Sequence, residues 1–127
     1  MNRASERDSD ALNREELVDR LLGNVALAQR MLSQFLDTIP EEIDLLEAVI
    51  RIGYPEEIAS LAHRHKGTAK TLAAGRVAEV AAEIEIQARE GSTSNLLSLL
   101  DELRTSYTHL QDELDAWARE ASDGASK

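Results

Sequence analysis

The C-terminal part of the sequence carries apolar residues at a spacing that only a helix satisfies. From residue 96 to residue 117 an apolar side chain returns every three or four positions without a miss. Because an α-helix turns once in about 3.6 residues, this spacing places all of them on one face, like the buried seam of a helical bundle. Such a seam needs other helices to cover it. The seam consists of Leu96, Leu100, Leu103, Tyr107, Leu110, Leu114 and Trp117.

Few helix-breaking residues divide the rest of the chain. Two prolines and six glycines interrupt a sequence rich in Ala, Leu, Glu and Arg, which are residues of high helix propensity. Aromatic residues make up 3% of the chain, and alternation of apolar and polar residues is almost absent, which disfavours β-sheet. A short first helix is expected to be capped by Asn13. The predicted breaks between helices fall at Gly23-Asn24, Pro40, Gly53, Gly75 and Gly91-Ser92.

Short connections between amphipathic helices favour antiparallel neighbours. The sequence therefore predicts an all-α fold, an up-and-down antiparallel four-helix bundle with one or two short helices at its N-terminal side. Residues 1–10 and 120–127 are mostly polar or small and carry too little apolar surface to offset the entropy of ordering them. We predict two disordered tails over these ranges and a single bundle domain over residues 11–119.

Composition and charge exclude several classes of function. The chain has 14 Lys and Arg against 24 Asp and Glu, a formal net charge of -10, so we expect it not to bind nucleic acid. It has no cysteine and therefore no disulfide, thiolate nucleophile or iron–sulfur cluster. The sequence contains no run of about 18 apolar residues, which a membrane-spanning helix requires, and its start lacks the apolar stretch of a signal peptide. We expect a soluble, cytoplasmic monomer without membrane contact.

Positive charge is concentrated in one segment of this acidic chain. Residues 58–78 contain no Asp or Glu, but they contain two histidines, two arginines and two lysines. In a helix of about 100° per residue, positions i, i+3, i+4 and i+7 share one face, and the apolar side chains of this segment lie on another. An exposed histidine is thus expected with an ammonium group one turn away. The shared face consists of His63, Lys66, Gly67 and Lys70.

Gly67 leaves a gap beside the His63 imidazole. A glycine inside a helix costs roughly 0.5–1 kcal/mol relative to alanine, so its presence here needs a reason. Without a side chain at this position a second protein can approach His63, and Lys66 can neutralise a charged group attached there. An exposed imidazole titrates near pH 6.5 and is mostly an uncharged nucleophile at neutral pH. The arrangement fits the acceptor half of a phosphoryl transfer, and a merely solvated histidine fits the same spacing.

The remaining titratable residues are expected to have structural roles. His65 lies about 200° around the helix from His63, within the apolar stripe, so the two cannot bind one metal ion, and we expect His65 in the core. His109 is expected at the surface. The carboxylates of the following helix have no histidine at metal-ligand spacing, so we predict no metal site. These carboxylates, predicted to be solvated, are Glu79, Glu83, Glu85 and Glu90.

Residues 61–69 read LAHRHKGTA. This segment resembles the signature of histidine-containing phosphotransfer (HPt) domains, which runs approximately A-H-x-L-K-G-S/T-A. The similarity extends over about residues 13–118. The resemblance implies that His63 is the phosphorylated residue, Lys66 a cation near the phosphoryl group and Gly67 the residue that clears access.

The resemblance also implies a function. HPt domains pass a phosphoryl group between the aspartates of receiver domains and have no ATP site of their own. The chain would thus be a phosphocarrier without kinase activity, a phosphorelay intermediate that takes a phosphoryl group from one receiver and passes it to another. Its partners would be receiver domains of response regulators or hybrid sensor kinases. No cofactor is expected on this chain, because the receiver brings the Mg²⁺. The alternative is a non-catalytic helical adaptor that docks response-regulator receivers.

Three positions depart from the family pattern. His65 replaces the usual Leu, Ala73 stands where Gly is common, and Lys70 stands where many members have a small residue. Helical geometry keeps His63 as the acceptor, because His65 lies on the buried side of the same helix. Lys70 and Arg64 are candidates for docking an acidic receiver, and each is equally an ordinary solvated charge.

Overall fold

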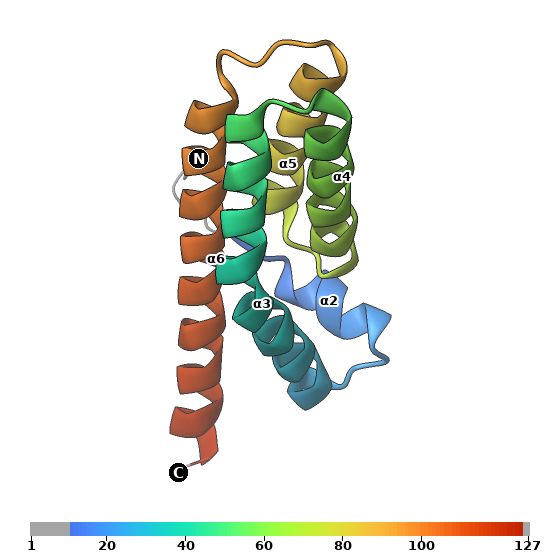
Figure 1. The fold of residues 1–127 in the computed structure, drawn as a ribbon. Helices are drawn as coiled ribbons and strands as arrows, with labels where there is room; N and C mark the ends of the chain where they lie inside the picture. The colour runs from blue at the N-terminus through green and yellow to red at the C-terminus, as the bar shows by residue number, and fades with distance from the viewer. Residues whose placement is uncertain (1–10, 126–127) are drawn as a thin grey trace, which may run out of the picture.

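The computed structural model describes residues 11–125, with side chains up to residue 120. This part of the chain forms only helices, so the predicted all-α fold is confirmed. The elements are α2 (Arg14–Arg20), α3 (Val25–Ile52), α4 (Pro55–Thr71), α5 (Gly75–Arg89) and α6 (Leu96–Ala125) (Figure 1).

The four long helices form an antiparallel bundle around one core, and α2 lies at the end where α4 turns into α5 (Figure 1). Helix α3 packs against α4 and α6, and α5 packs against the same two helices. Every residue of the predicted seam on α6 is buried, from Leu96 with 0% of its surface exposed to Trp117 with 8%. The up-and-down bundle with a short N-terminal helix is therefore as predicted.

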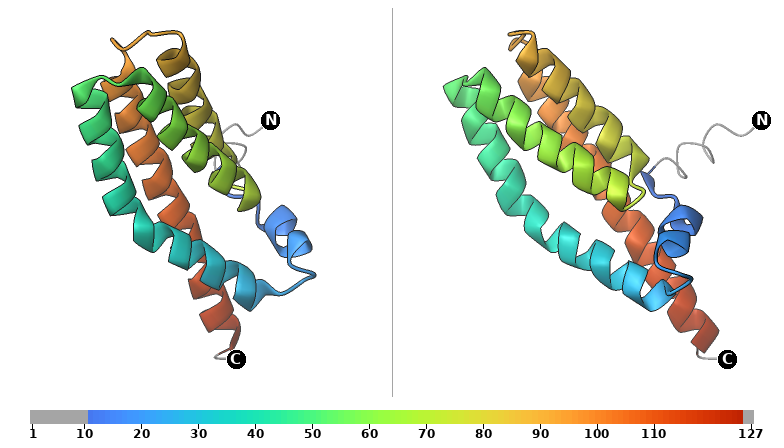
Figure 2. Two further views of the ribbon diagram at one scale, coloured as in Figure 1. Left: turned by 45° about the vertical axis from the view of Figure 1, so that its right-hand side comes forward. Right: turned by 90° about the vertical axis from the view of Figure 1, so that its right-hand side faces the viewer.

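The break predicted at Pro40 is wrong, because α3 runs through this residue as one helix of 28 residues. A proline inside a helix removes one backbone hydrogen bond and crowds the carbonyl four residues earlier, which bends a helix without having to end it. Helix α3 curves along its length (Figure 2). Ile39 and Ile43, on either side of Pro40, are both buried, so packing against the core holds the two halves in one helix.

The turn between α4 and α5 is tighter than predicted. Helix α4 ends at Thr71, and Gly75, the predicted end of that helix, is instead the first residue of α5. Ala73, at the position where the family commonly has Gly, has φ of 58°, a left-handed conformation that disfavours any residue with a Cβ atom. The side chain of Arg20 donates to the carbonyl oxygens of Thr71 (2.8 Å) and Lys70. Helix α2 thus caps the end of α4.

Helix α6 extends beyond residue 119, the predicted end of the bundle domain. Helix α6 continues to Ala125, so residues 120–125 are helical where a disordered tail is predicted. Extending an existing helix gains one hydrogen bond for each residue fixed, whereas only nucleation is costly. Glu120 forms an ion pair with Arg14 at 2.9 Å, which anchors this part of α6 to α2. The other predicted tail, residues 1–10, lies outside the described residues.

Candidate functional site

His63 lies on the outer face of α4 and is exposed as predicted, with 60% of its side chain accessible. Helix α4 begins at Pro55, where a proline lacks only a hydrogen bond that the first turn would not make. Glu56 and Glu57 follow in that turn and complement the positive end of the helix dipole. His63 comes two turns later, on the side of α4 that faces neither α3 nor the core.

The imidazole of His63 is held by a carboxylate from the neighbouring helix. Its Nδ1 lies 3.1 Å from Oε2 of Glu85 on α5, and the Glu85 side chain is only 9% exposed. Because an ionised carboxylate only accepts hydrogen bonds, this contact places the imidazole proton on Nδ1. The lone pair of Nε2 is then free on an exposed ring, which is the form in which an imidazole acts as a nucleophile.

Glu85 is the centre of a small charge cluster. Nζ of Lys66 lies 2.7 Å from Oε1 of Glu85, and the guanidinium of Arg89 donates to Oε2 from Nη2 at 2.9 Å. Hydrogen bonds from Lys66, and then from Arg89 and His63, lower the pKa of Glu85 to about 2 although burial raises it. Glu85 is therefore a fixed negative charge over the physiological pH range, as a group that orients His63 has to be.

Lys66 is placed near His63 as predicted, but it is not a fully solvated cation. It lies one helical turn after His63, and only 23% of its side chain is exposed. Its ammonium group points to Glu85 in this structure, because an ion pair at the edge of the buried region compensates the charge of both partners. The cation is thus fixed within one turn of the His63 imidazole.

Gly67 is not required by the fold. It lies in the helical interior of α4 without a positive φ, and a Cβ atom added to it would meet nothing within 4 Å. Alanine would therefore fit and would favour the helix by roughly 0.5–1 kcal/mol. The fold itself therefore gives no reason for a glycine one turn after His63.

His65 lies in the core, as predicted. It is 5% exposed, and its Nδ1 lies 2.5 Å from the hydroxyl of Tyr107 on α6. Burial lowers the pKa of His65, and the nearby Glu42 carboxylate opposes this. Burial of the Tyr107 hydroxyl, together with the nearby Glu42 carboxylate, raises the pKa of Tyr107. The structure therefore separates His65 from the exposed face that carries His63.

The two candidate docking residues follow His63 on α4. Arg64 is 62% exposed and turns towards α3, where it forms an ion pair with Glu42 at 3.3 Å. Lys70 is exposed near the end of α4, next to α2. His109, on α6, is exposed as predicted. No described hydrogen bond or ion pair joins Arg64, Lys70 and the His63 imidazole to one another.

Glu85 is the site residue that sequence reasoning missed, and its predicted solvation is wrong. The residue follows the buried Ala81 by four positions and precedes the buried Ala88 by three. This register places it on the buried side of α5, and a carboxylate there requires a cationic partner. The basic residues of α4 are candidates for this partner. Only the packing of α4 against α5 shows that Lys66 and His63 are the ones that contact Glu85.

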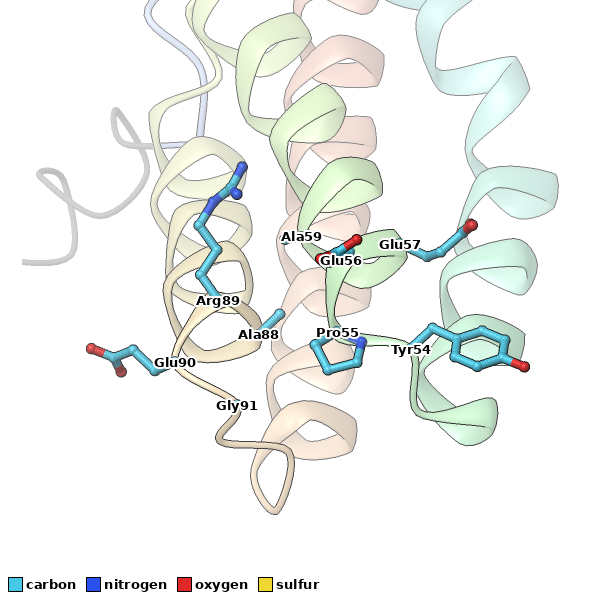
Figure 3. Close-up of a pocket in the computed structure, with 9 residues that line it drawn as sticks. All are labelled: Tyr54, Pro55, Glu56, Glu57, Ala59, Ala88, Arg89, Glu90 and Gly91. Carbon is cyan, nitrogen blue, oxygen red and sulfur yellow. The ribbon is translucent and has the colours of Figure 1, made fainter.

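The structure offers little support for other kinds of site. No group of three or more His, Cys, Asp or Glu side chains is placed to hold a metal ion in the described part of the chain. None of the helices within residues 11–125 is long and apolar enough to cross a membrane. A groove of about 880 Å³ lies between the start of α4 and the end of α5 (Figure 3). It shares Arg89 with the Glu85 cluster.

The fold and the site define a class: a helical bundle with an exposed histidine on α4 whose imidazole contacts a buried carboxylate of α5. The family model of the Hpt domain matches residues 30–119, and the chain belongs to this family. Hpt domains take part in histidine phosphotransfer in phosphorelays, where they interact with receiver domains and are phosphocarriers rather than kinases. Comparisons with curated proteins and with solved structures gave no significant match.

Proposed function

We propose that this protein is a phosphorelay intermediate that accepts a phosphoryl group on Nε2 of His63 from the aspartate of one receiver domain and passes it to another. The observation that supports this most directly is the contact between Nδ1 of His63 and Glu85 at 3.1 Å. It fixes one ring nitrogen and leaves the other available on an imidazole that is 60% exposed. A receiver can therefore reach Nε2 without any change in the bundle.

The transfer step balances without a separate base. The lone pair of His63 Nε2 attacks the phosphorus of the receiver's aspartyl phosphate, a bond from nitrogen to phosphorus forms, and the bond from phosphorus to the aspartate oxygen breaks. The aspartate leaves as a carboxylate, and the proton on Nδ1 stays where it is. The ring becomes a cation, and Glu85 stabilises it as a carboxylate partner stabilises an imidazolium. Transfer to the second receiver is the reverse of these steps.

Lys66 and Gly67 serve the incoming group. The ammonium of Lys66 is one helical turn from His63, and its attraction offsets part of the negative charge that the phosphoryl group brings. Gly67 leaves the surface beside the ring open, so the receiver's acidic pocket can bring the phosphorus in line with Nε2. Mg²⁺ is expected on the receiver, and the chain itself is proposed to need no cofactor.

Arg64 and Lys70 are proposed to dock the acidic surface of the receiver. Both are exposed and lie on α4, the helix that carries His63. Attraction between surface charges mainly raises the rate of association and falls with salt. The proposed partners are therefore receiver domains of response regulators or hybrid sensor kinases, bound over the outer face of α4.

The test is label transfer from a panel of receiver domains that have been phosphorylated with radiolabelled acetyl phosphate. Wild type is expected to take up acid-labile label, and His63→Gln to take up none while its helical circular dichroism stays intact. The buried His65→Gln and the exposed His109→Gln serve as controls that retain labelling. Label retained by His63→Gln would overturn the assignment. Binding of receivers without any label would indicate a docking adaptor instead.

A further inference from the structure

Arg89 donates hydrogen bonds to the same oxygen of Glu85 that the proposed acceptor, His63, contacts. It donates to Oε2 of Glu85 from Nε at 3.1 Å and from Nη2 at 2.9 Å, and Nδ1 of His63 lies 3.1 Å from that oxygen. Lys66 contacts the other oxygen, Oε1. The Arg89 side chain is 61% exposed and runs along α5 away from Gly91 (Figure 3). Two helices thus direct three N–H groups at one atom.

This sharing weakens the contact between Glu85 and His63. A carboxylate oxygen offers about two lone pairs, so two N–H groups from Arg89 leave less of Oε2 for the imidazole. The guanidinium also cancels the charge of Glu85, and Lys66 adds a second cation. With a neutral His63, the cluster of Glu85, Lys66 and Arg89 has a net charge of +1. An imidazole beside such a cluster holds a second proton less tightly than one beside a lone carboxylate.

We propose that Arg89 is a positioning residue that acts through Glu85 to keep His63 in its neutral, nucleophilic form. The proposal rests on the proposed function, because it takes His63 as the phosphoryl acceptor. Nε2 must be free of a proton to attack phosphorus, so the fraction of protein ready for transfer depends on how tightly the second proton is held. Arg89 contacts the carboxylate oxygen that faces Nδ1, and so acts on the proton and not on the phosphoryl group.

Among the charged residues around His63, Arg89 is the one whose substitution tests this proposal. Lys66 on α4 and Glu85 on α5 belong to the proposed acceptor site itself. Arg64, next to His63 in sequence, turns to Glu42 on α3. On α5 the remaining arginine, Arg76, forms an ion pair with Glu79 at 3.2 Å. Arg76 has the same side chain on the same helix without a contact to Glu85, and it therefore provides a matched control.

The experiment is a pH titration of the His63 imidazole, followed by its Cε1–H nuclear magnetic resonance signal in the unphosphorylated protein. In Arg89→Met the titration midpoint is expected to rise by about 0.5 pH unit, because without the guanidinium the Glu85 carboxylate stabilises the protonated imidazole more strongly. Arg89→Lys is expected to restore most of the wild-type midpoint, and Arg76→Met to leave it unchanged. In a Glu85→Gln background the shift caused by Arg89→Met should be smaller.

An unchanged midpoint in Arg89→Met, or an equal rise in Arg76→Met, would overturn the proposal. A shift of the same size in the Glu85→Gln background would show that Arg89 does not act through Glu85, and would also overturn it. The titration needs no phosphoryl transfer, so it remains readable if the proposed function fails. Where transfer is observed, its rate in Arg89→Met should approach the wild-type rate at higher pH, whereas mere structural damage lowers the rate at every pH.

Discussion

Two histidines that lie two positions apart on α4 have opposite surroundings. The side chain of His63 is 60% exposed and its Nδ1 contacts the Glu85 carboxylate, whereas His65 is 5% exposed and its Nδ1 contacts the Tyr107 hydroxyl. Each ring therefore has one nitrogen that is fixed by a neighbouring helix. The rings differ in the other nitrogen, because Nε2 of His65 is buried without a hydrogen-bond partner among the described residues.

The comparison separates orientation from access. Both faces of α4 orient an imidazole, but only the outer face leaves a nitrogen that a second protein can reach. The outer face also supplies a charged partner that can stabilise an imidazolium, while the inner face supplies a neutral hydroxyl and a low dielectric that disfavour it. Orientation is thus a by-product of helix packing on both sides of α4, and access with charge compensation is specific to His63.

The largest effect should come from closing the outer face. Gly67→Gln places a long side chain beside His63, so phosphoryl transfer is expected to fall to background while circular dichroism and thermal stability show a folded bundle. Thr68→Gln adds the same bulk at the next position, about 100° further around the helix, and should retain transfer. Equal transfer rates in Gly67→Gln and wild type would show that access is not what Gly67 provides.

The next effect should come from removing the charge behind His63. Glu85→Gln keeps the size of the side chain but removes the carboxylate that stabilises the imidazolium, so transfer is expected to slow by about tenfold or more, a loss of at least about 1.4 kcal/mol of transition-state stabilisation. The exposed Glu83 on the same helix provides the control Glu83→Gln. The comparison is measured as the rate of label uptake from a phosphorylated receiver, and equal rates in both variants would contradict the role of Glu85.

The inner face should make stability depend on pH. Burial lowers the pKa of His65 in the folded state, so the unfolded chain binds a proton near pH 6.5 that the folded protein resists. Stability is therefore expected to fall as the pH drops below about 6.5, by up to about 1.4 kcal/mol per pH unit. His65→Leu should flatten this slope, and His109→Leu should not. Urea unfolding at pH 7 and pH 5 measures how the free energy of unfolding changes with pH. The same change in His65→Leu as in wild type would contradict the account.

The smallest effect concerns backbone preference on the two faces. Gly67→Ala is expected to stabilise the protein by roughly 0.5–1 kcal/mol, because nothing obstructs a Cβ atom there and alanine favours the helix. Ala69→Gly, at a buried position with 0% exposure, should destabilise by at least as much, since it loses both helix preference and packing. Thermal unfolding of both variants provides the measurement. A loss of stability in Gly67→Ala would mean that the fold itself requires the glycine.

Helical periodicity was sufficient for the buried seam and for one half of the site. The seam on α6 and the shared face of His63, Lys66 and Gly67 depend only on the 3.6-residue turn, and both predictions of exposure and burial are confirmed for His63 and His65. Local signals also placed the cap at Asn13, whose side chain accepts from the backbone of Glu16. These features are set by residues within one or two turns of each other.

The features that sequence reasoning missed depend on packing between helices. Pro40 has the local signature of a helix start, and only the core contacts on both sides of it keep α3 continuous. Glu85 lies in the buried register of α5, but its contact with His63, 22 residues earlier in the chain, is defined only once α5 packs beside α4. The left-handed Ala73 is likewise imposed by the tight turn between these two helices. In each case tertiary contacts override or complete a local preference.

The most direct test of the central claim is to determine which nitrogen of which histidine carries the phosphoryl group. Nitrogen-15 and phosphorus nuclear magnetic resonance of the protein, phosphorylated by a receiver domain, distinguishes the two ring nitrogens by their coupling to phosphorus. The account predicts a single phosphoryl group on Nε2 of His63, with the Nδ1 proton retained opposite Glu85. A phosphoryl group on Nδ1 of His63, or on His65, would contradict it.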